Sequence, residues 1–185
     1  GFVGPGGLAN QDAEYIRSDH AVAGLEYLVS PTARFTLEGF YKKYDNYPVS
    51  LSTGVSLANL GGDFSVLGNE DISSIGEGRT YGIEFLYQKK FSKNYYAILA
   101  YTWYSSEFTG LDGIYRSSAW DSNNLLTFTG GYKFGNNWEL SARVRYLGET
   151  PYAPIDQQAT LDNYPAMIRD YDRLGTVRRN TFNQT

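Results

Sequence analysis

The segment from Trp138 to Tyr146 alternates apolar and polar residues at every position. Successive side chains of a β-strand point to opposite sides of a sheet, so this segment predicts a strand with two different faces. The apolar face carries Trp138, Leu140, Ala142, Val144 and Tyr146. The polar face carries Glu139, Ser141, Arg143 and Arg145. A sheet built from such strands meets an apolar environment on one side and a wet one on the other.

Six segments have strand character, and most of them are longer than the strands of ordinary globular proteins. We expect strands over residues 19–29, 33–45, 79–90, 95–106, 121–134 and 138–146. Globular strands usually have about 5–6 residues, whereas a tilted membrane-spanning strand needs about 9–11. The segment 95–106 is apolar at most positions, so its alternation does not assign its two sides.

The links between these segments alternate between short and long. Short turns are expected at Ser30-Pro31-Thr32, at Ser92-Lys93-Asn94 and at Gly135-Asn136-Asn137. Long irregular links are expected over residues 46–78 and 107–120, and again after Leu147. Antiparallel strands that follow one another place all short turns at one end of the sheet and all long links at the other. Short turns opposite long loops are typical of transmembrane β-barrels.

The chain is rich in aromatic residues, with 17 Tyr, 10 Phe and 3 Trp among 185 residues. Large rings with a polar atom suit a membrane interface, where one end of the side chain is apolar and the other is wet. No apolar run approaches the roughly 20 residues that a membrane-spanning helix needs. A barrel strand needs no such run, because only every second residue faces lipid.

Composition excludes several classes of function. The chain has no cysteine and a single histidine, His20, so we predict no disulfide, no metal site and no cofactor. The net charge is −4 without a basic block, so nucleic acid is not an expected partner. The sequence lacks a Gly-x-Ser-x-Gly nucleophile motif, and we predict no catalytic residues and no enzymatic activity.

Three stretches carry a resemblance to a known family. Residues 79–104 combine a Tyr-Gly-Ile-Glu strand, a short turn and a strand that ends in Tyr-Thr-Trp-Tyr. Residues 120–134 run from Trp-Asp-Ser-Asn-Asn to Gly-Tyr-Lys-Phe, and residues 137–152 run from Asn-Trp-Glu-Leu to Glu-Thr-Pro-Tyr. Together these stretches resemble the carboxy-terminal barrel of TonB-dependent outer-membrane receptors, in the form found in Bacteroidetes. The resemblance extends over about residues 8–180.

The resemblance implies an all-β fold, namely an antiparallel transmembrane β-barrel segment. Six strands are fewer than the minimum of about 8 for a membrane barrel, and plugged transporter barrels have about 22. We therefore expect residues 1–185 to be part of a larger barrel. The plug domain and the last strands of the family are expected outside these residues, and the first and sixth strands are expected to pair with other segments.

The implied function is ligand-gated uptake of a small solute across the outer membrane of a Gram-negative bacterium. The partners implied are outer-membrane lipid, a TonB-type energy transducer that acts through the missing amino-terminal part, and a siderophore, vitamin, glycan or peptide. Two alternatives stay open. One is a passive porin or structural outer-membrane barrel, and the other is a soluble carbohydrate-binding β-sandwich.

The alternation of apolar and polar residues along the strands also predicts candidate site residues. The expected outward, lipid-facing residues are Phe35, Leu37, Tyr81, Ile83, Phe85, Phe128, Tyr132, Leu140, Ala142 and Val144. The expected lumen-facing or plug-facing residues are Glu38, Lys42, Glu84, Arg143 and Arg145, unless these charges simply pair with each other. The candidates for ligand contact near the long-loop end are Trp103, Tyr104, Trp120 and Tyr152. Their alternative role is an interfacial aromatic belt.

Overall fold

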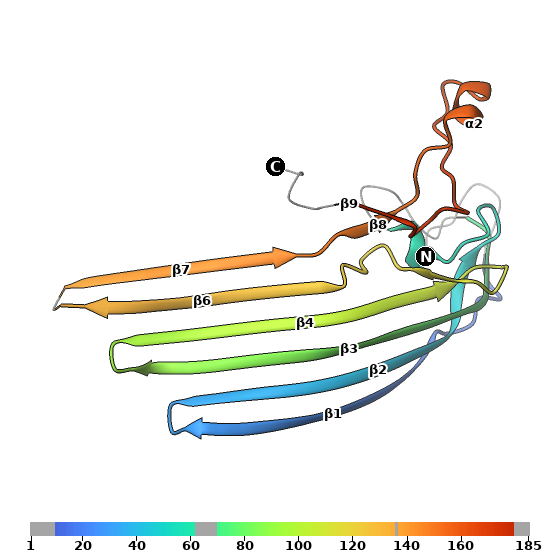
Figure 1. The fold of residues 1–185 in the computed structure, drawn as a ribbon. Coiled ribbons are helices and arrows are strands. Elements are labelled where there is room, and N and C mark those ends of the chain that lie inside the picture. Colours follow the sequence, from blue (N-terminus) through green and yellow to red (C-terminus); the bar gives the residue numbers. More distant parts are fainter. Residues whose placement is uncertain (1–9, 62–69, 136, 180–185) are drawn as a thin grey trace.

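The computed structural model describes residues 10–61, 70–135 and 137–179, and its main feature is one antiparallel sheet that bends towards the end with the long loops (Figure 1). Its six long strands follow one another in space in chain order. They are β1 (Arg17–Ser30), β2 (Ala33–Ser50), β3 (Ile72–Ser92), β4 (Tyr95–Thr109), β6 (Asn124–Phe134) and β7 (Trp138–Leu147). The all-β prediction is confirmed.

Smaller elements are gathered at the loop end of the sheet (Figure 1). The short strand β5 (Tyr115–Ser117) pairs with β4, while β8 (Thr150–Tyr152) and β9 (Val177–Arg179) form a separate two-stranded sheet. The helices are α1 (Leu57–Leu60) and α2 (Gln157–Asp162). Neither described helix has the length and apolar character required to cross a membrane.

The ends of the sheet differ as the sequence predicts. The connections β1–β2, β3–β4 and β6–β7 are tight turns at one end, and the long connections lie at the other (Figure 1). Lys93 and Asn94 adopt positive φ in their turn, as does Gly135 in the last one. Asn94 and Gly135 are residue types that tolerate the left-handed region, whereas Lys93 adopts it because the tight turn requires it. Asn136 of the expected turn lies outside the described residues.

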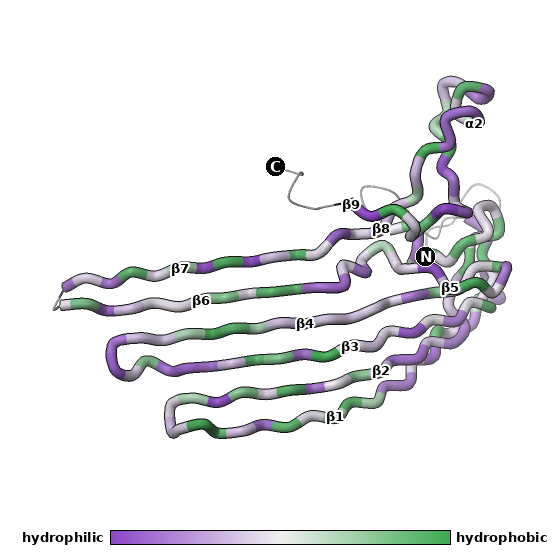
Figure 2. Tube along the Cα trace, in the orientation of Figure 1, coloured by the Kyte–Doolittle hydropathy of each residue, from purple (hydrophilic) through white to green (hydrophobic). Residues whose placement is uncertain are grey.

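The register separates the two faces of the sheet across all six long strands. One unbroken row of directly opposed residues is Leu25, Leu37, Phe85, Tyr101, Leu126 and Tyr146. All the expected outward residues share this apolar face, and the row places Tyr95, Ala97, Leu99, Tyr101 and Trp103 of β4 on it too. The alternation of hydropathy along each strand is visible in Figure 2.

The apolar face has no covering layer among the described residues (Figure 1). Leu25, Leu140 and Val144 are each more than half exposed. A β-sandwich buries such a face against a second sheet, whereas the small β8–β9 sheet lies at the loop end (Figure 1). An uncovered apolar face of this extent needs an apolar environment outside the chain.

Strand limits differ from the expected ones where alternation fails. The link expected over 46–78 is shorter, because β2 runs to Ser50 and β3 starts at Ile72. Pairing continues there through irregularities between Tyr44 and Tyr47 and between Tyr47 and Val49. Each bulge shifts the side-chain period by one residue, so the residues beyond it no longer follow the apolar–polar alternation that predicts a strand.

Two further expectations at the loop end were wrong. The fifth strand was expected to begin near residue 121, but β6 begins at Asn124. Asn123 has a φ of 59°, which is not a strand conformation, and the Asp121 side chain is buried among hydrogen-bond partners. The stretch expected to be irregular over 107–120 contains the end of β4 and the hairpin strand β5, and the tail after Leu147 contains β8, β9 and α2.

The connecting loops pack against each other rather than standing apart. Val55, Ala153 and Leu174 form a small buried cluster, and Leu60 and Tyr171 pack against it. The Asn59 side-chain amide donates hydrogen bonds of 2.8 Å to the carbonyl oxygens of Arg116 and Ser117. Segments from three different connections therefore share one ordered assembly at the loop end.

Candidate functional site

Two carboxylates face each other at the centre of the polar face. Glu38 of β2 lies directly opposite Glu84 of β3, and the next residue in this row is Thr102. Like charges directly opposite one another destabilise a sheet unless a cation compensates them. Within the described part of the chain, neither Glu38 nor Glu84 has an ion pair or hydrogen bond through its side chain. The pair is therefore a candidate site for a cationic group.

Two guanidinium groups lie on the same face of β7. Arg143 is opposite Thr129 and Arg145 is opposite Thr127. The nearby carboxylate of Glu139 is engaged elsewhere: it lies 3.7 Å from Lys133 Nζ and accepts a 3.1 Å hydrogen bond from the Tyr96 hydroxyl. The described residues give Arg143 and Arg145 no acidic partner, so this stretch of the polar face is a candidate site for an anionic group.

Other charges on the polar face are already satisfied. Arg34 pairs with Glu26 at 2.9 Å and donates a 3.0 Å hydrogen bond to Gln88. Lys42 lies opposite His20 and Thr80, with its ammonium 5.4 Å from the ring centre of Phe40. The register thus places all five expected lumen-facing or plug-facing residues on one face, and among them four charges lack a described partner.

The aromatic ligand-contact candidates divide into two groups. Tyr104 lies on the polar face, and its hydroxyl donates a 2.5 Å hydrogen bond to the carbonyl oxygen of Trp120. Tyr152 lies on β8, with the Arg179 guanidinium 4.7 Å from its ring centre. Trp103 lies instead on the apolar face, where its ring is 6.2 Å from that of Tyr81.

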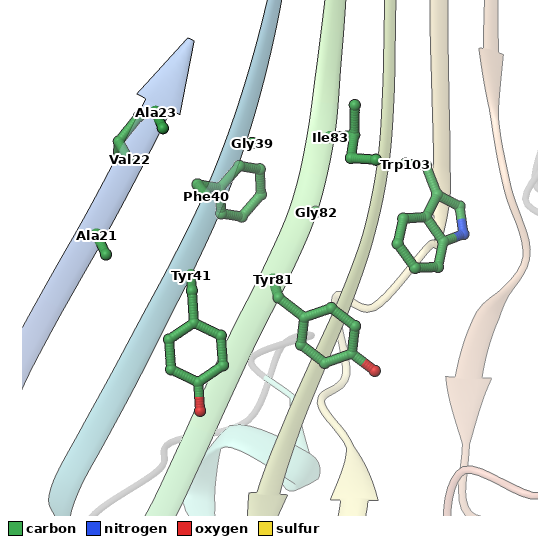
Figure 3. A pocket seen from close by; sticks show the side chains of 10 residues that line it. All are labelled: Ala21, Val22, Ala23, Gly39, Phe40, Tyr41, Tyr81, Gly82, Ile83 and Trp103. Atoms are coloured by element: carbon green, nitrogen blue, oxygen red, sulfur yellow. The ribbon is translucent and has the colours of Figure 1, made fainter.

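A hollow of about 510 Å³ lies beside Trp103 on the apolar face. Small residues of β1 and β2 line it together with larger side chains of β2, β3 and β4 (Figure 3). The residues that line it by their side chains are Ala21, Ala23, Tyr41, Tyr81, Ile83 and Trp103, and Gly39 lines it by its backbone. This hollow is on the opposite side of the sheet from the charged residues, so it is not part of the polar site.

A buried ion pair holds the connecting loops together at the loop end, and the sequence patterns did not identify it. The Asp121 side chain is fully buried, and its Oδ2 lies 3.0 Å from Nη2 of Arg178. Its Oδ1 accepts hydrogen bonds from the Ser106 amide at 3.2 Å and from the Asn123 side-chain amide at 3.1 Å. The partners are 57 residues apart, so no local motif signals the contact.

The β5 hairpin is fastened by a second set of charges. The Arg79 guanidinium lies 2.7 Å from Glu107 and 4.3 Å from the ring centre of Tyr115. In the loop before β5, two hydrogen bonds of 2.7 and 3.0 Å from Arg116 hold the pKa of the Asp112 carboxyl at about 2, below its ordinary value of 3.8.

Residues 10–61, 70–135 and 137–179 contain no group of three or more His, Asp or Glu side chains that could hold a metal ion.

A long-stranded antiparallel sheet with one bare apolar face and one charged face is the wall of a membrane β-barrel. The comparison with protein families agrees: the model of the family described as "TonB dependent receptor-like, beta-barrel" matches residues 3–177. The chain belongs to this family, whose members are transporters rather than enzymes. No curated protein matches the chain.

Proposed function

We propose that this chain forms part of the barrel of an outer-membrane receptor that takes up a small solute, with a TonB-type transducer supplying the energy. The observation that carries the proposal is the two-faced sheet, in which an uncovered apolar face backs a polar face with uncompensated charges. Membership of the TonB-dependent receptor-like family supports the outer membrane of a Gram-negative bacterium as the location of such a sheet.

The apolar face is the lipid-facing side in this proposal, and the polar face lines the lumen. In the described residues β1 and β7 each pair with a single neighbour, which leaves unpaired backbone groups along both edges. Such groups cost several kcal/mol each in hydrocarbon. Further strands from other segments therefore continue the sheet on both sides and close it into a barrel, which for plugged transporters has about 22 strands.

The uncompensated charges of the polar face receive partners from inside the barrel. Glu38 and Glu84 suit a cationic group of a plug domain, and Arg143 and Arg145 suit an anionic group of the plug or of the passing solute. Lys42 lies on the same face and is a further contact with the lumen. Other charged residues of the polar face form described ion pairs, which supports a partner outside the described residues for the charges that form none.

The solute meets the aromatic residues near the outer loops before it enters the lumen. Tyr104, Trp120 and Tyr152 offer rings that stack on a sugar, a peptide or a siderophore. Trp103 remains a candidate, although its place on the apolar face also suits the interfacial aromatic belt. The hydroxyls of Tyr41 and Tyr81 point towards the end of the sheet that carries α1 (Figure 3), as interfacial tyrosines do.

The test is a growth comparison in the source bacterium. Strains that lack the receptor gene, the transducer gene or both are grown on panels of single iron, vitamin, glycan and peptide sources. Loss of growth on the same source in all three strains supports the proposal. If the receptor strain alone loses growth and the transducer strain does not, the protein is a passive pore, which is the second candidate function.

A further inference from the structure

We propose that Arg178 is a positioning residue that latches the loop of residues 148–179 onto the segment of residues 117–121 and, through Asp121, onto the loop end of β4. The latch holds Trp120 and Tyr152 in place before a solute arrives. The assignment of these two residues to solute contact rests on the proposed function. The latch itself rests only on the contacts of Arg178.

The Arg178 guanidinium joins three separate segments of the chain. Besides the ion pair with Asp121, its Nη1 donates a 2.7 Å hydrogen bond to the Asp121 carbonyl oxygen and a 3.3 Å bond to the carbonyl oxygen of Glu149. Its Nη2 donates a 3.2 Å bond to the Ser117 hydroxyl. A planar fork with fixed donor directions suits such a set of acceptors, and a lysine ammonium does not match it.

The carboxylate that Arg178 meets is fully buried. A buried charge is stable only when it is paired and hydrogen-bonded, and removal of one partner leaves it uncompensated. Asp121 also accepts a hydrogen bond from the backbone of Ser106, a β4 residue, so the contact reaches the barrel wall. Because this partner belongs to β4, the loop is fixed to a rigid element of the sheet.

The latch is next to the aromatic residues in both segments that it joins. Trp120 precedes Asp121, and its carbonyl oxygen is held by the Tyr104 hydroxyl and by the Ser122 amide. Tyr152 pairs with Val177, the residue before Arg178. Displacement of Arg178 would therefore free Asp121, the neighbour of Trp120, and would loosen the strand residue next to the partner of Tyr152.

Beyond the latch, the loop extends away from the sheet. The arm that carries α2 projects from the loop end (Figure 1), and Leu161, Tyr164 and Met167 on it are largely exposed. At the base of the arm, Ala153 and Leu174 are buried against Val55. This contact is apolar and without direction. Backbone hydrogen bonds from Gly148 to Asn124 and between β8 and β9 hold the base of the loop. The bonds of Arg178 add the directional side-chain link from β9 to Ser117 and Asp121.

The test places a nitroxide spin label at Asp162→Cys, at the end of α2, in the full-length receptor in native outer membranes without solute. The printed chain has no cysteine, so labelling within it is specific. We expect Arg178→Gln to convert the spectrum of the label from slow to mainly fast motion, and Arg178→Lys to give a mixture. Arg173→Gln removes the same charge from an exposed side chain of the same loop and is expected to leave the spectrum unchanged.

An unchanged spectrum in Arg178→Gln, in a receptor whose heat-modifiable gel migration shows a folded barrel, overturns the latch. If Arg178→Gln does not assemble into a folded barrel, Arg178→Lys is used instead, and an unchanged spectrum of the label in Arg178→Lys overturns the latch. The positioning of Trp120 has its own readout, the difference in acrylamide quenching between each variant and its Trp120→Phe partner. This quenching should rise at least twofold in Arg178→Gln, and an unchanged value overturns the positioning role. Neither readout needs uptake, so both outcomes are independent of the proposed transport.

Discussion

An arginine placed at Ala142 is expected to destabilise the barrel strongly, because Ala142 lies in the middle of the apolar face of β7. It lies four positions beyond Trp138, which is about 13 Å along a strand at about 3.3 Å per residue. With a strand tilt of about 40°, Ala142 stands about 10 Å above Trp138, and the whole strand spans about 25 Å, the height of the apolar band of a barrel. The site is thus close to the bilayer midplane, where arginine costs about 2–4 kcal/mol.

The matched control is Ser141→Arg, one residue away on the polar face of the same strand. Its side chain enters the wet side, so we expect a change below about 1 kcal/mol. The assay is urea unfolding of the full-length receptor in lipid vesicles, followed by tryptophan fluorescence and by heat-modifiable gel migration. Equal midpoints for Ala142→Arg and the parent, or a larger loss in Ser141→Arg than in Ala142→Arg, would refute the assignment of the two faces.

Two further predictions concern packing and pH. A Cβ at Gly78 would overlap the buried ring of Phe108, whereas the nearest atom to a Cβ at Gly39 is 4.0 Å away. In the same urea assay, Gly78→Ala should therefore lower the free energy of unfolding by about 1–3 kcal/mol, and Gly39→Ala should leave it nearly unchanged. Because the pKa of Asp112 is lowered, its ionised form stabilises the loop before β5 above pH 3.8, and this contribution is lost as the pH falls through about 2. An NMR titration of the Asp112 carboxyl should therefore have its midpoint near 2, and Arg116→Gln should return it towards 3.8; an unchanged midpoint would refute the cause.

Regular alternation is what made the fold predictable from the sequence. The nine residues from Trp138 to Tyr146 give the faces of β7 without reference to any other strand. Pro31 and Gly135 mark turns by their backbone restrictions, and the position of one turn fixes which residues of two strands are opposed. The antiparallel topology and the separation of the faces followed from these local signals alone.

Features that depend on the pairing of distant residues were not predictable in this way. β4 is apolar on both sides, so only its register against β3 and β6 assigns Trp103 to the apolar face. The bulges around Tyr47 extend β2 beyond the point where alternation ends. The contact of Asp121 with Arg178 depends on the folding of a long loop back onto the sheet, and no periodicity encodes such a return.

The five charged site candidates share one face of the sheet, and their roles remain predictions. Glu38 and Glu84 were assigned to the wet side from two separate strands, but their direct opposition is a property of the register. Contact of these residues with a plug, and contact of Trp120 or Tyr152 with a solute, remain predictions, because the chain carries no signal for the identity of its partners.

The central claim, that the polar face lines a lumen and the apolar face meets lipid, is tested most directly by a label scan along β7. Single spin labels at residues 140–145 of the full-length receptor in outer membranes are compared for collision with oxygen, which enters lipid, and with a water-soluble nickel complex. We predict oxygen accessibility at 140, 142 and 144 and nickel accessibility at 141, 143 and 145. A scan without this two-residue period, or with the two sets exchanged, would contradict the claim.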